Sequence, residues 1–182
     1  MYARSSAGLR SAGLLILLAV CGSLLMALSA KIMVPMVPVP ITGQTLAIPL
    51  LVVLLGRNGA TLAVLAYLIE GALGLPVFAA GALLSATGGY LLAFPLAAFT
   101  IGWMFERGLD RTYLTRLAAI VAGTSLVFVG GLLWLIAVFH VSPRSAVALG
   151  LVPFLIGDAL KCAIAAAVAP VWPKIAARLG IA

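Results

Sequence analysis

The run from Leu117 to Phe139 contains no charged residue and is almost entirely apolar. A helix needs about 20 apolar residues to cross the hydrocarbon core of a bilayer, so this run is long enough to span one. The rest of the chain has the same character, because 65% of its 182 residues are hydrophobic and only 8% are charged. A soluble domain carries about 25% charged residues. The sequence therefore predicts an all-α, multi-pass integral protein of the cell (cytoplasmic) membrane.

Interruptions of the apolar sequence divide the chain into helices. The sequence GRNG at Gly56–Gly59 is a turn between two short apolar segments, which we expect to form a helical hairpin. Ser142 followed by Pro143 is typical of a helix start. The first run follows Arg4 and Arg10 as in a signal peptide, but we expect it to be retained, because the rest of the chain spans the membrane anyway. We predict a single transmembrane domain, 1–182, with six transmembrane helices at about residues 9–30, 45–55, 60–73, 90–105, 117–139 and 143–171.

The basic residues indicate the orientation of the helices. Cytoplasmic loops of membrane proteins are enriched in Lys and Arg. Cytoplasmic N- and C-termini would leave only Lys31 and Arg144 in outer loops, with Lys161 inside the last helix. The net charge of +7 then indicates topology and contact with the lipid bilayer, not a nucleic-acid surface. The residues expected on the cytoplasmic side are Arg4, Arg10, Arg57, Arg107, Arg111, Arg116, Lys174 and Arg178.

A proline-rich connector, Lys31 to Thr45, joins the first two predicted helices on the outer side. Prolines can keep such a segment extended while leaving fewer backbone donors unpaired. The connector ends in three hydrogen-bonding side chains, Thr42, Gln44 and Thr45. Two interpretations stay open: a rigid external loop with a helix N-cap at Thr42, or the polar rim of a ligand site.

Two charged residues, Asp158 and Lys161, lie within the last predicted helix. Their i, i+3 spacing places them on one face. Ionisable groups at membrane depth are costly unless they are paired or wetted. The pair is therefore either self-neutralising and structural, or the floor of a polar cavity in which Lys161 and Asp158 contact a ligand.

Two further sequence patterns each allow both a functional and a purely structural interpretation. Gly88, Gly89 and Tyr90 open a helix, where free N–H groups and an aromatic ring could contact a polar ligand, or could form a simple interfacial turn. Ala19, Ser23 and Ala27 recur at four-residue spacing on the first helix. Small residues at this spacing allow close helix contact in lipid, either within the bundle or with another protein.

The chain has few of the residues that catalysis or metal binding would require. One histidine, His140, and two dispersed cysteines cannot build a zinc site, and no nucleophile–base set can be assembled convincingly. We therefore expect no metal, no cofactor and no enzymatic activity. The sequence also lacks the G-x-x-x-x-G-K-[ST] loop, so energy for uphill transport would have to come from a partner or a gradient.

Three segments together resemble the BioY family, the biotin-binding S components of energy-coupling factor (ECF) transporters. They are PVPITGQT (38–45), GLPVFAAG with TGGYLLAF (74–81 and 87–94), and PFLIGDALK (153–161). The resemblance covers nearly the whole chain and implies a six-helix S-component-like bundle that captures biotin from outside. Its partners would be an ECF transmembrane coupling subunit and two ABC ATPases, and a homo-oligomer is left open.

The resemblance also implies roles for the residues already singled out. The connector would close over the biotin. Asp158 and Lys161 would supply polar contacts deep in the site. Ala19, Ser23 and Ala27 on the first helix would form the surface that docks to the coupling subunit. The sequence departs from the family at AAGALLSATGGY, which is shortened and has Ala86 where a proline is expected. The biotin-binding residues implied are Thr42, Gln44, Thr45, Gly88, Gly89, Tyr90, Asp158 and Lys161.

Three other functions compete with biotin capture. The same fold could bind a different vitamin. A small intramembrane enzyme could use Asp158 and Tyr90, although acid, base and metal-binding residues are scarce. A structural membrane scaffold would need no ligand at all, and would tolerate loss of both charges at Asp158 and Lys161.

Overall fold

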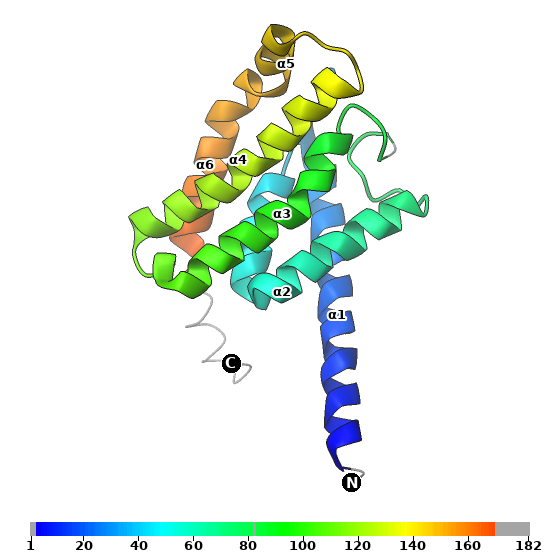
Figure 1. Cartoon of the computed structure of the whole chain (residues 1–182), viewed down its shortest axis with the longest axis vertical. Helices are drawn as coiled ribbons and strands as arrows, with labels where there is room; N and C mark the ends of the chain where they lie inside the picture. Colours follow the sequence, from blue (N-terminus) through cyan, green and yellow to red (C-terminus); the bar gives the residue numbers. More distant parts are fainter. Residues whose placement is uncertain (1–2, 82, 170–182) are drawn as a thin grey trace.

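A computed structural model describes residues 3–81 and 83–169 of the chain as a bundle of helices. Figure 1 shows the helices packed side by side, with α1 extending well beyond the others. A two-stranded sheet lies between α1 and α2, and a long connection without helix joins α2 to α3. The elements are α1 (Ala3–Lys31), β1 (Met33–Val34), β2 (Ile41–Thr42), α2 (Gln44–Ala72), α3 (Gly88–Met104), α4 (Tyr113–Ala137), α5 (Pro143–Gly150) and α6 (Leu155–Val168).

The predicted helical hairpin is a single bent element, α2. Gly56 has φ +69° and ψ −178°, which is not helical, and the chain changes direction there (Figure 1). Glycine has no Cβ and adopts positive φ without the steric penalty of other residues. The expected segments 45–55 and 60–73 are therefore the two parts of α2, and the turn at Gly56–Gly59 lies where the sequence predicted it.

The expected count of six spanning helices is not confirmed. Among the described residues, four helices are long and apolar enough to cross a membrane, and a shorter apolar stretch, Ile16–Lys31, lies within α1. The two expected segments on either side of Gly56 form one element, which accounts for one of the two missing spans. The other is the first helix, of which only the stretch Ile16–Lys31 is found, shorter than the other candidate spans. The four candidate spans are Gln44–Ala72, Gly88–Leu109, Tyr113–Ala137 and Pro143–Val168.

The last expected helix, 143–171, is broken in the structure. It begins as predicted, since the Ser142 side chain accepts a hydrogen bond from the Ser145 backbone N–H and Pro143 follows it. It then ends at Gly150 and continues through a 3-10 turn, Val152–Phe154, into α6. Pro153 explains the break, because proline has no N–H and disfavours helical geometry in the preceding residue. Residues 170 and 171 lie outside the described part.

The proline-rich connector contains the only strands of the described chain, which the all-α prediction missed. Met33 pairs with Thr42, and Val34 pairs with Ile41, in antiparallel register. The Lys31 ammonium group donates hydrogen bonds to the carbonyl oxygens of Pro76 and Phe78, at 2.8 and 3.0 Å. The connector and the α2–α3 loop are therefore held together at the end of α1.

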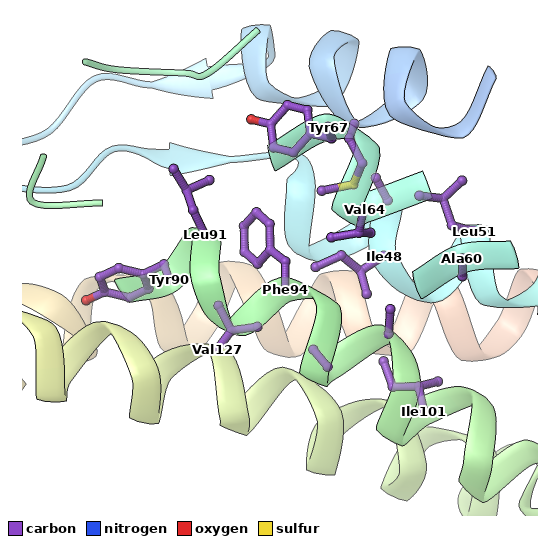
Figure 2. Packing of buried hydrophobic residues seen from close by; sticks show 14 of the residues in the cluster. Ile48, Leu51, Ala60, Val64, Tyr67, Tyr90, Leu91, Phe94, Ile101 and Val127 are labelled. Atoms are coloured by element: carbon purple, nitrogen blue, oxygen red, sulfur yellow. The ribbon is translucent and has the colours of Figure 1, made fainter. Parts of the chain in front are cut away.

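The apolar core lies between α2, α3 and α4. Figure 2 shows Ile48 and Val64 from the two parts of α2 meeting Phe94 of α3, with Val127 of α4 beside them. Glycines allow α3 and α4 to approach closely: a Cβ at Gly130 would lie 2.7 Å from the Cβ of Ala93. Small residues are typical of helix contacts in membranes because they let two backbones come together.

Charged side chains gather at one end of the bundle. Arg57, at the bend of α2, forms an ion pair with Glu106 at the end of α3, with 3.1 Å between Nη1 and Oε2. Figure 1 shows this bend at the same end as the α3–α4 connection, while α5 lies at the opposite end. His140, next to α5, is exposed.

Candidate binding cavity

A cavity opens beneath the β1–β2 connector, between the start of α2 and helices α3, α4 and α6. Its volume is about 40 Å³, room for a few water molecules, so the site is nearly closed. Most of its wall is apolar, and the polar groups gather where α2 faces α6. The lining residues are Val39, Pro40, Thr42, Gln44, Thr45, Ala79, Thr87, Tyr90, Leu91, Phe94, Val127, Phe128, Phe154, Asp158 and Lys161.

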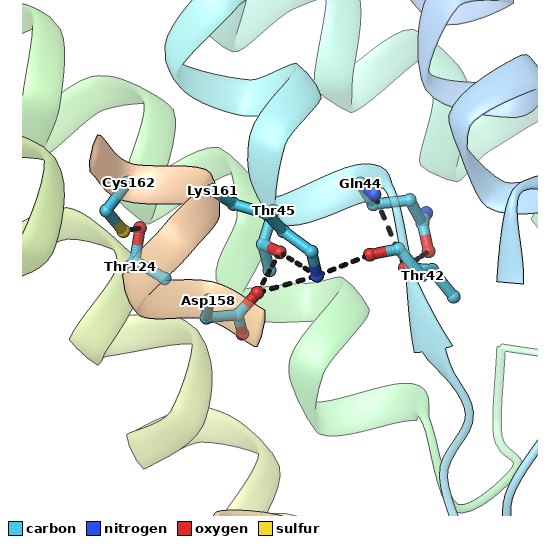
Figure 3. A network of polar contacts seen from close by, with 7 residues as sticks. All are labelled: Thr42, Gln44, Thr45, Thr124, Asp158, Lys161 and Cys162. Atoms are coloured by element: carbon cyan, nitrogen blue, oxygen red, sulfur yellow. Dashed lines mark hydrogen bonds and ion pairs between the residues drawn. The ribbon is translucent and has the colours of Figure 1, made fainter. Parts of the chain in front are cut away.

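Lys161 uses all its hydrogen-bonding capacity within the protein. Its ammonium group donates to the backbone carbonyl of Thr42 (2.7 Å), to Thr45 Oγ1 (3.1 Å) and to Asp158 Oδ1 (2.7 Å), as Figure 3 shows. An ammonium group has three N–H donors. Lys161 is therefore saturated by the protein, and it joins α6 both to the start of α2 and to the end of β2.

Asp158 has one saturated and one free oxygen. Its Oδ1 accepts hydrogen bonds from Lys161 and, at 2.6 Å, from the Thr45 hydroxyl. The residue is only 5% exposed, and Oδ2 is buried with no hydrogen-bond partner among the described residues. Buried polar atoms are normally satisfied, and leaving one unpaired is costly. Asp158, one of the lining residues, therefore carries one strong acceptor without a partner in the described part of the chain.

Gln44 fixes the rim of the cavity at the start of α2. Its side-chain amide nitrogen donates to the Tyr67 hydroxyl at 2.8 Å, and its Oε1 accepts from the Thr42 hydroxyl at 3.0 Å. Gln44 is buried, and Figure 3 shows it beside Thr42 at the end of the strand. The amide thus ties the connector to the second part of α2, which carries Tyr67.

Three aromatic rings form one wall of the cavity. Tyr90 stacks near Phe154, with ring centroids 6.3 Å apart, and Phe128 meets both rings edge-on. The Tyr90 hydroxyl donates to the Gly150 carbonyl at 2.8 Å, so its polar end is already satisfied and the ring is left as an apolar part of the lining. Such a wall suits a flat or apolar part of a ligand.

Gly88 and Gly89 do not line the cavity, in contrast to the expectation. A Cβ at Gly88 would lie 3.0 Å from the Trp134 ring, and a Cβ at Gly89 would overlap Trp134 and the Gly130 carbonyl. Gly88 allows close approach of the α2–α3 loop at the Leu83 carbonyl and of Trp134, and Gly89 allows close packing of α3 against α4. Successive residues of a helix point about 100° apart, so Tyr90 reaches the cavity while the two glycines before it do not.

The small-residue stripe of α1 is largely an internal contact. Ser23 is completely buried, and its hydroxyl donates to Glu70 Oε1 of α2 at 2.6 Å. Ala19 and Ala27 are partly exposed. At Ser23 the structure therefore favours packing within the bundle, the alternative that the sequence left open.

Several lining residues were not found from the sequence. Thr87 directly precedes the recognised glycines, and Phe154 lies within the segment PFLIGDALK. Phe128 had no distinguishing signal, because one aromatic residue in an apolar helix is most often a packing residue. Its role follows only from its contacts with Tyr90 and Phe154.

The arrangement suits binding more than catalysis. An apolar, aromatic wall faces a buried carboxylate with a free oxygen, and the cavity is covered by a connector that shares hydrogen bonds with its floor. The Tyr90 hydroxyl, a catalytic candidate, is already bonded to a backbone carbonyl. The described residues contain no cluster of three metal-ligating side chains.

Comparison with known proteins identifies similar chains. A model of the BioY family matches residues 4–178. The chain is 39% identical over 150 residues to the biotin transporter BioY of Thermotoga maritima, covering 80% of this chain and 87% of that protein. It is 38% identical over 150 residues to the probable biotin transporter BioY of Pyrococcus horikoshii, with the same coverage. The fold matches a crystal structure of the S-component for biotin from an ECF-type ABC transporter, with a TM-score of 0.77, 22% identity, and coverage of 96% of this chain and 95% of that one.

Proposed function

The chain belongs to the BioY family, and on this premise we propose that it captures biotin at the outer side of the cytoplasmic membrane for uptake. The observation that carries the proposal is the unpartnered Oδ2 of Asp158 at the floor of the covered cavity. Biotin combines a ureido ring with two N–H donors, an apolar bicycle with a thioether, and a carboxylate tail. A buried carboxylate beside an aromatic wall is complementary to the first two of these parts.

In the proposed complex, Asp158 Oδ2 accepts a hydrogen bond from a ureido N–H group. The bicycle lies against Tyr90, Phe128 and Phe154. Lys161 acts indirectly, because its three donors are occupied by protein oxygens and its ammonium group holds Asp158 Oδ1 in place. Thr45 acts in the same way, since its hydroxyl donates to Oδ1.

The connector acts as the lid of the site in this proposal. Val39 and Pro40 cover the cavity, and the Thr42 carbonyl is bonded directly to Lys161. Entry of biotin therefore requires the connector to move, and its return restores the bonds of Thr42 and Gln44. Binding energy and lid closure are coupled through these contacts.

The test of the proposal is equilibrium binding of radiolabelled biotin to the detergent-solubilised protein without ATP. We expect a dissociation constant below micromolar, and no displacement of the label by thiamine or riboflavin. A monodisperse, folded sample that retains no biotin at micromolar concentration contradicts the proposal. Displacement by another vitamin instead would assign the same cavity to a different ligand.

Transport requires partners in this proposal. The chain would act as an S component with an ECF coupling subunit and two ABC ATPases, which supply the energy, and not as an enzyme. We propose that the coupling subunit contacts α1 at the partly exposed edges of its small-residue stripe, Ala19 and Ala27. Ser23, between them on the same stripe, is buried against Glu70 and would not contact the subunit itself.

We also propose that both parts of α2 enter the membrane, which gives six crossings with both termini in the cytoplasm. The part from Gln44 to Leu55 is about 18 Å long at 1.5 Å per residue, which is shorter than the hydrocarbon core of about 30 Å. The connector must therefore cross the remaining thickness. The end with Arg57 and Glu106 would then face the cytoplasm.

Cysteine labelling tests this orientation. In a variant with Cys21 and Cys162 replaced by alanine, Asn58→Cys and Arg144→Cys each introduce one exposed thiol, at opposite ends of the bundle. An impermeant maleimide added to intact cells should label Arg144→Cys and leave Asn58→Cys unlabelled until the membrane is opened. The reverse pattern, or equal labelling of both, would contradict the proposed orientation.

A further inference from the structure

A second cavity lies at the charged end of the bundle and shares no lining residue with the first. It encloses about 980 Å³ of empty space, with its open mouth included. It is bounded by the first part of α2, the end of α3, the start of α4 and the end of α6. Its lining residues are Val52, Val53, Phe105, Glu106, Asp110, Arg111, Arg116 and Ala169.

Arg116 is a buried guanidinium group without an ion-pair partner in the described part of the chain. The residue is 7% exposed, and its Nη1 donates to the backbone carbonyl of Asp110 at 3.0 Å. Its Nε is buried and donates to no acceptor among the described residues. A buried cation is costly unless an anion compensates it, so the cavity lacks a negative group at this position.

The other charges of the cavity do not compensate Arg116. Glu106 already forms an ion pair with Arg57, at 3.1 Å. Asp110 and Arg111 also line the cavity, and no ion pair involving either side chain is formed among the described residues. The charged lining residues are two arginines and two carboxylates, so the lining has no net charge, but neither carboxylate is within ion-pair distance of Arg116.

The geometry favours a phosphate group as the missing anion. Arginine offers a planar fork of N–H donors, which matches the oxygens of phosphate. Arg116 lies in the first turn of α4, where the helix dipole also favours negative charge. The cavity also has an apolar side, formed by Val52, Val53 and Phe105. Such a side could contact the acyl chains of a lipid whose headgroup binds the arginine.

We propose that this cavity binds the phosphate group of an anionic phospholipid or of a soluble phosphate through Arg116, with Arg111 at its mouth. The proposal is independent of biotin binding, because the two cavities lie at different places in the bundle. A bound phosphate would fill the buried position beside α2, α4 and α6, and so stabilise their packing.

The experiment measures thermal unfolding of the delipidated full-length protein in detergent. One arm titrates phosphatidylglycerol against diacylglycerol, which has the same acyl chains without phosphate. The other arm titrates inorganic phosphate against chloride at equal ionic strength. We expect phosphatidylglycerol to raise the unfolding temperature and diacylglycerol to leave it unchanged; a rise with inorganic phosphate as well would identify a site open to soluble phosphates.

Matched variants assign the effect to the cavity. Arg116→Gln should weaken the apparent affinity for the effective phosphate compound at least tenfold. Arg107→Gln is the control, because the Arg107 guanidinium stacks over Trp103 at 3.8 Å and does not line the cavity. Arg111→Gln, at an exposed residue, tests the site even if Arg116→Gln does not fold, and should also weaken binding.

Two results overturn the proposal. The first is that neither phosphatidylglycerol nor inorganic phosphate stabilises the wild-type protein beyond its uncharged or chloride control. The second is that Arg111→Gln and Arg107→Gln respond equally to phosphate, which would indicate general attraction of anions to a basic surface. A carboxylate supplied by a protein partner would produce the first result.

Discussion

Asp158→Asn is expected to weaken biotin binding by about ten- to a hundredfold, because a hydrogen bond to a charged group contributes about 1.5–3 kcal/mol. The substitution keeps the size of the side chain and removes the charge on Oδ2, the unpartnered acceptor of the cavity. It also leaves the Lys161 ammonium group without its anionic partner. Calorimetry with biotin, on the purified variant and on wild type, measures the loss.

Lys161→Met separates the role of Asp158 from that of the ion pair. Removing one member of a buried pair costs about 3–5 kcal/mol of stability, so this variant should unfold at lower temperature. The double variant Asp158→Asn/Lys161→Met removes both charges and should regain stability without regaining biotin binding. Asp110→Asn, a carboxylate at the opposite end of the bundle, is the control and should bind as wild type. Wild-type affinity in the double variant would show that the pair is only structural.

Gly131→Ala is expected to destabilise the protein and to impair biotin binding together. A Cβ at Gly131 would overlap the ring of Tyr90, which is held from its other side by Phe154 and at its hydroxyl by Gly150. Overpacking of a core costs about 1–3 kcal/mol. The ring must shift to accept the added Cβ, and because it lines the cavity, the space for the ligand changes with it.

Thermal unfolding and biotin titration of Gly131→Ala test this expectation. Gly157→Ala is the matched control, because a Cβ at Gly157 would meet no atom within 4 Å. The control should keep the stability and the affinity of wild type. If Gly131→Ala loses stability and binds biotin normally, the Tyr90 ring is not a wall of the functional site.

The polar residues of the cavity could be predicted from the sequence because they are rare in this chain. Asp158 and Lys161 stand alone in an apolar helix, and Thr42 and Gln44 follow a proline-rich connector. The structure places all four on one cavity, together with Thr45 and Tyr90. Their contact with biotin stays a prediction.

Other parts of the site could not be found in this way. Gly88 and Gly89 were expected at the cavity because they open a helix whose free N–H groups could meet a ligand, whereas the structure places them against Trp134 and outside the cavity lining. Ser23 fitted a docking stripe by spacing, and it is buried against Glu70. Spacing shows which residues share a helix face, whereas it does not show which neighbour that face meets.

The sequence by itself determined that the chain is a helical membrane protein with charges at one end and a polar cluster at depth. These properties follow from the cost of charge and of unpaired backbone groups in hydrocarbon, which applies whatever the packing. Only the tertiary structure decided that Met33 and Val34 pair with Thr42 and Ile41, and that Lys161 has no donor left for a ligand. Both depend on contacts between residues that are distant in sequence, which the pattern of residue types along the chain does not contain.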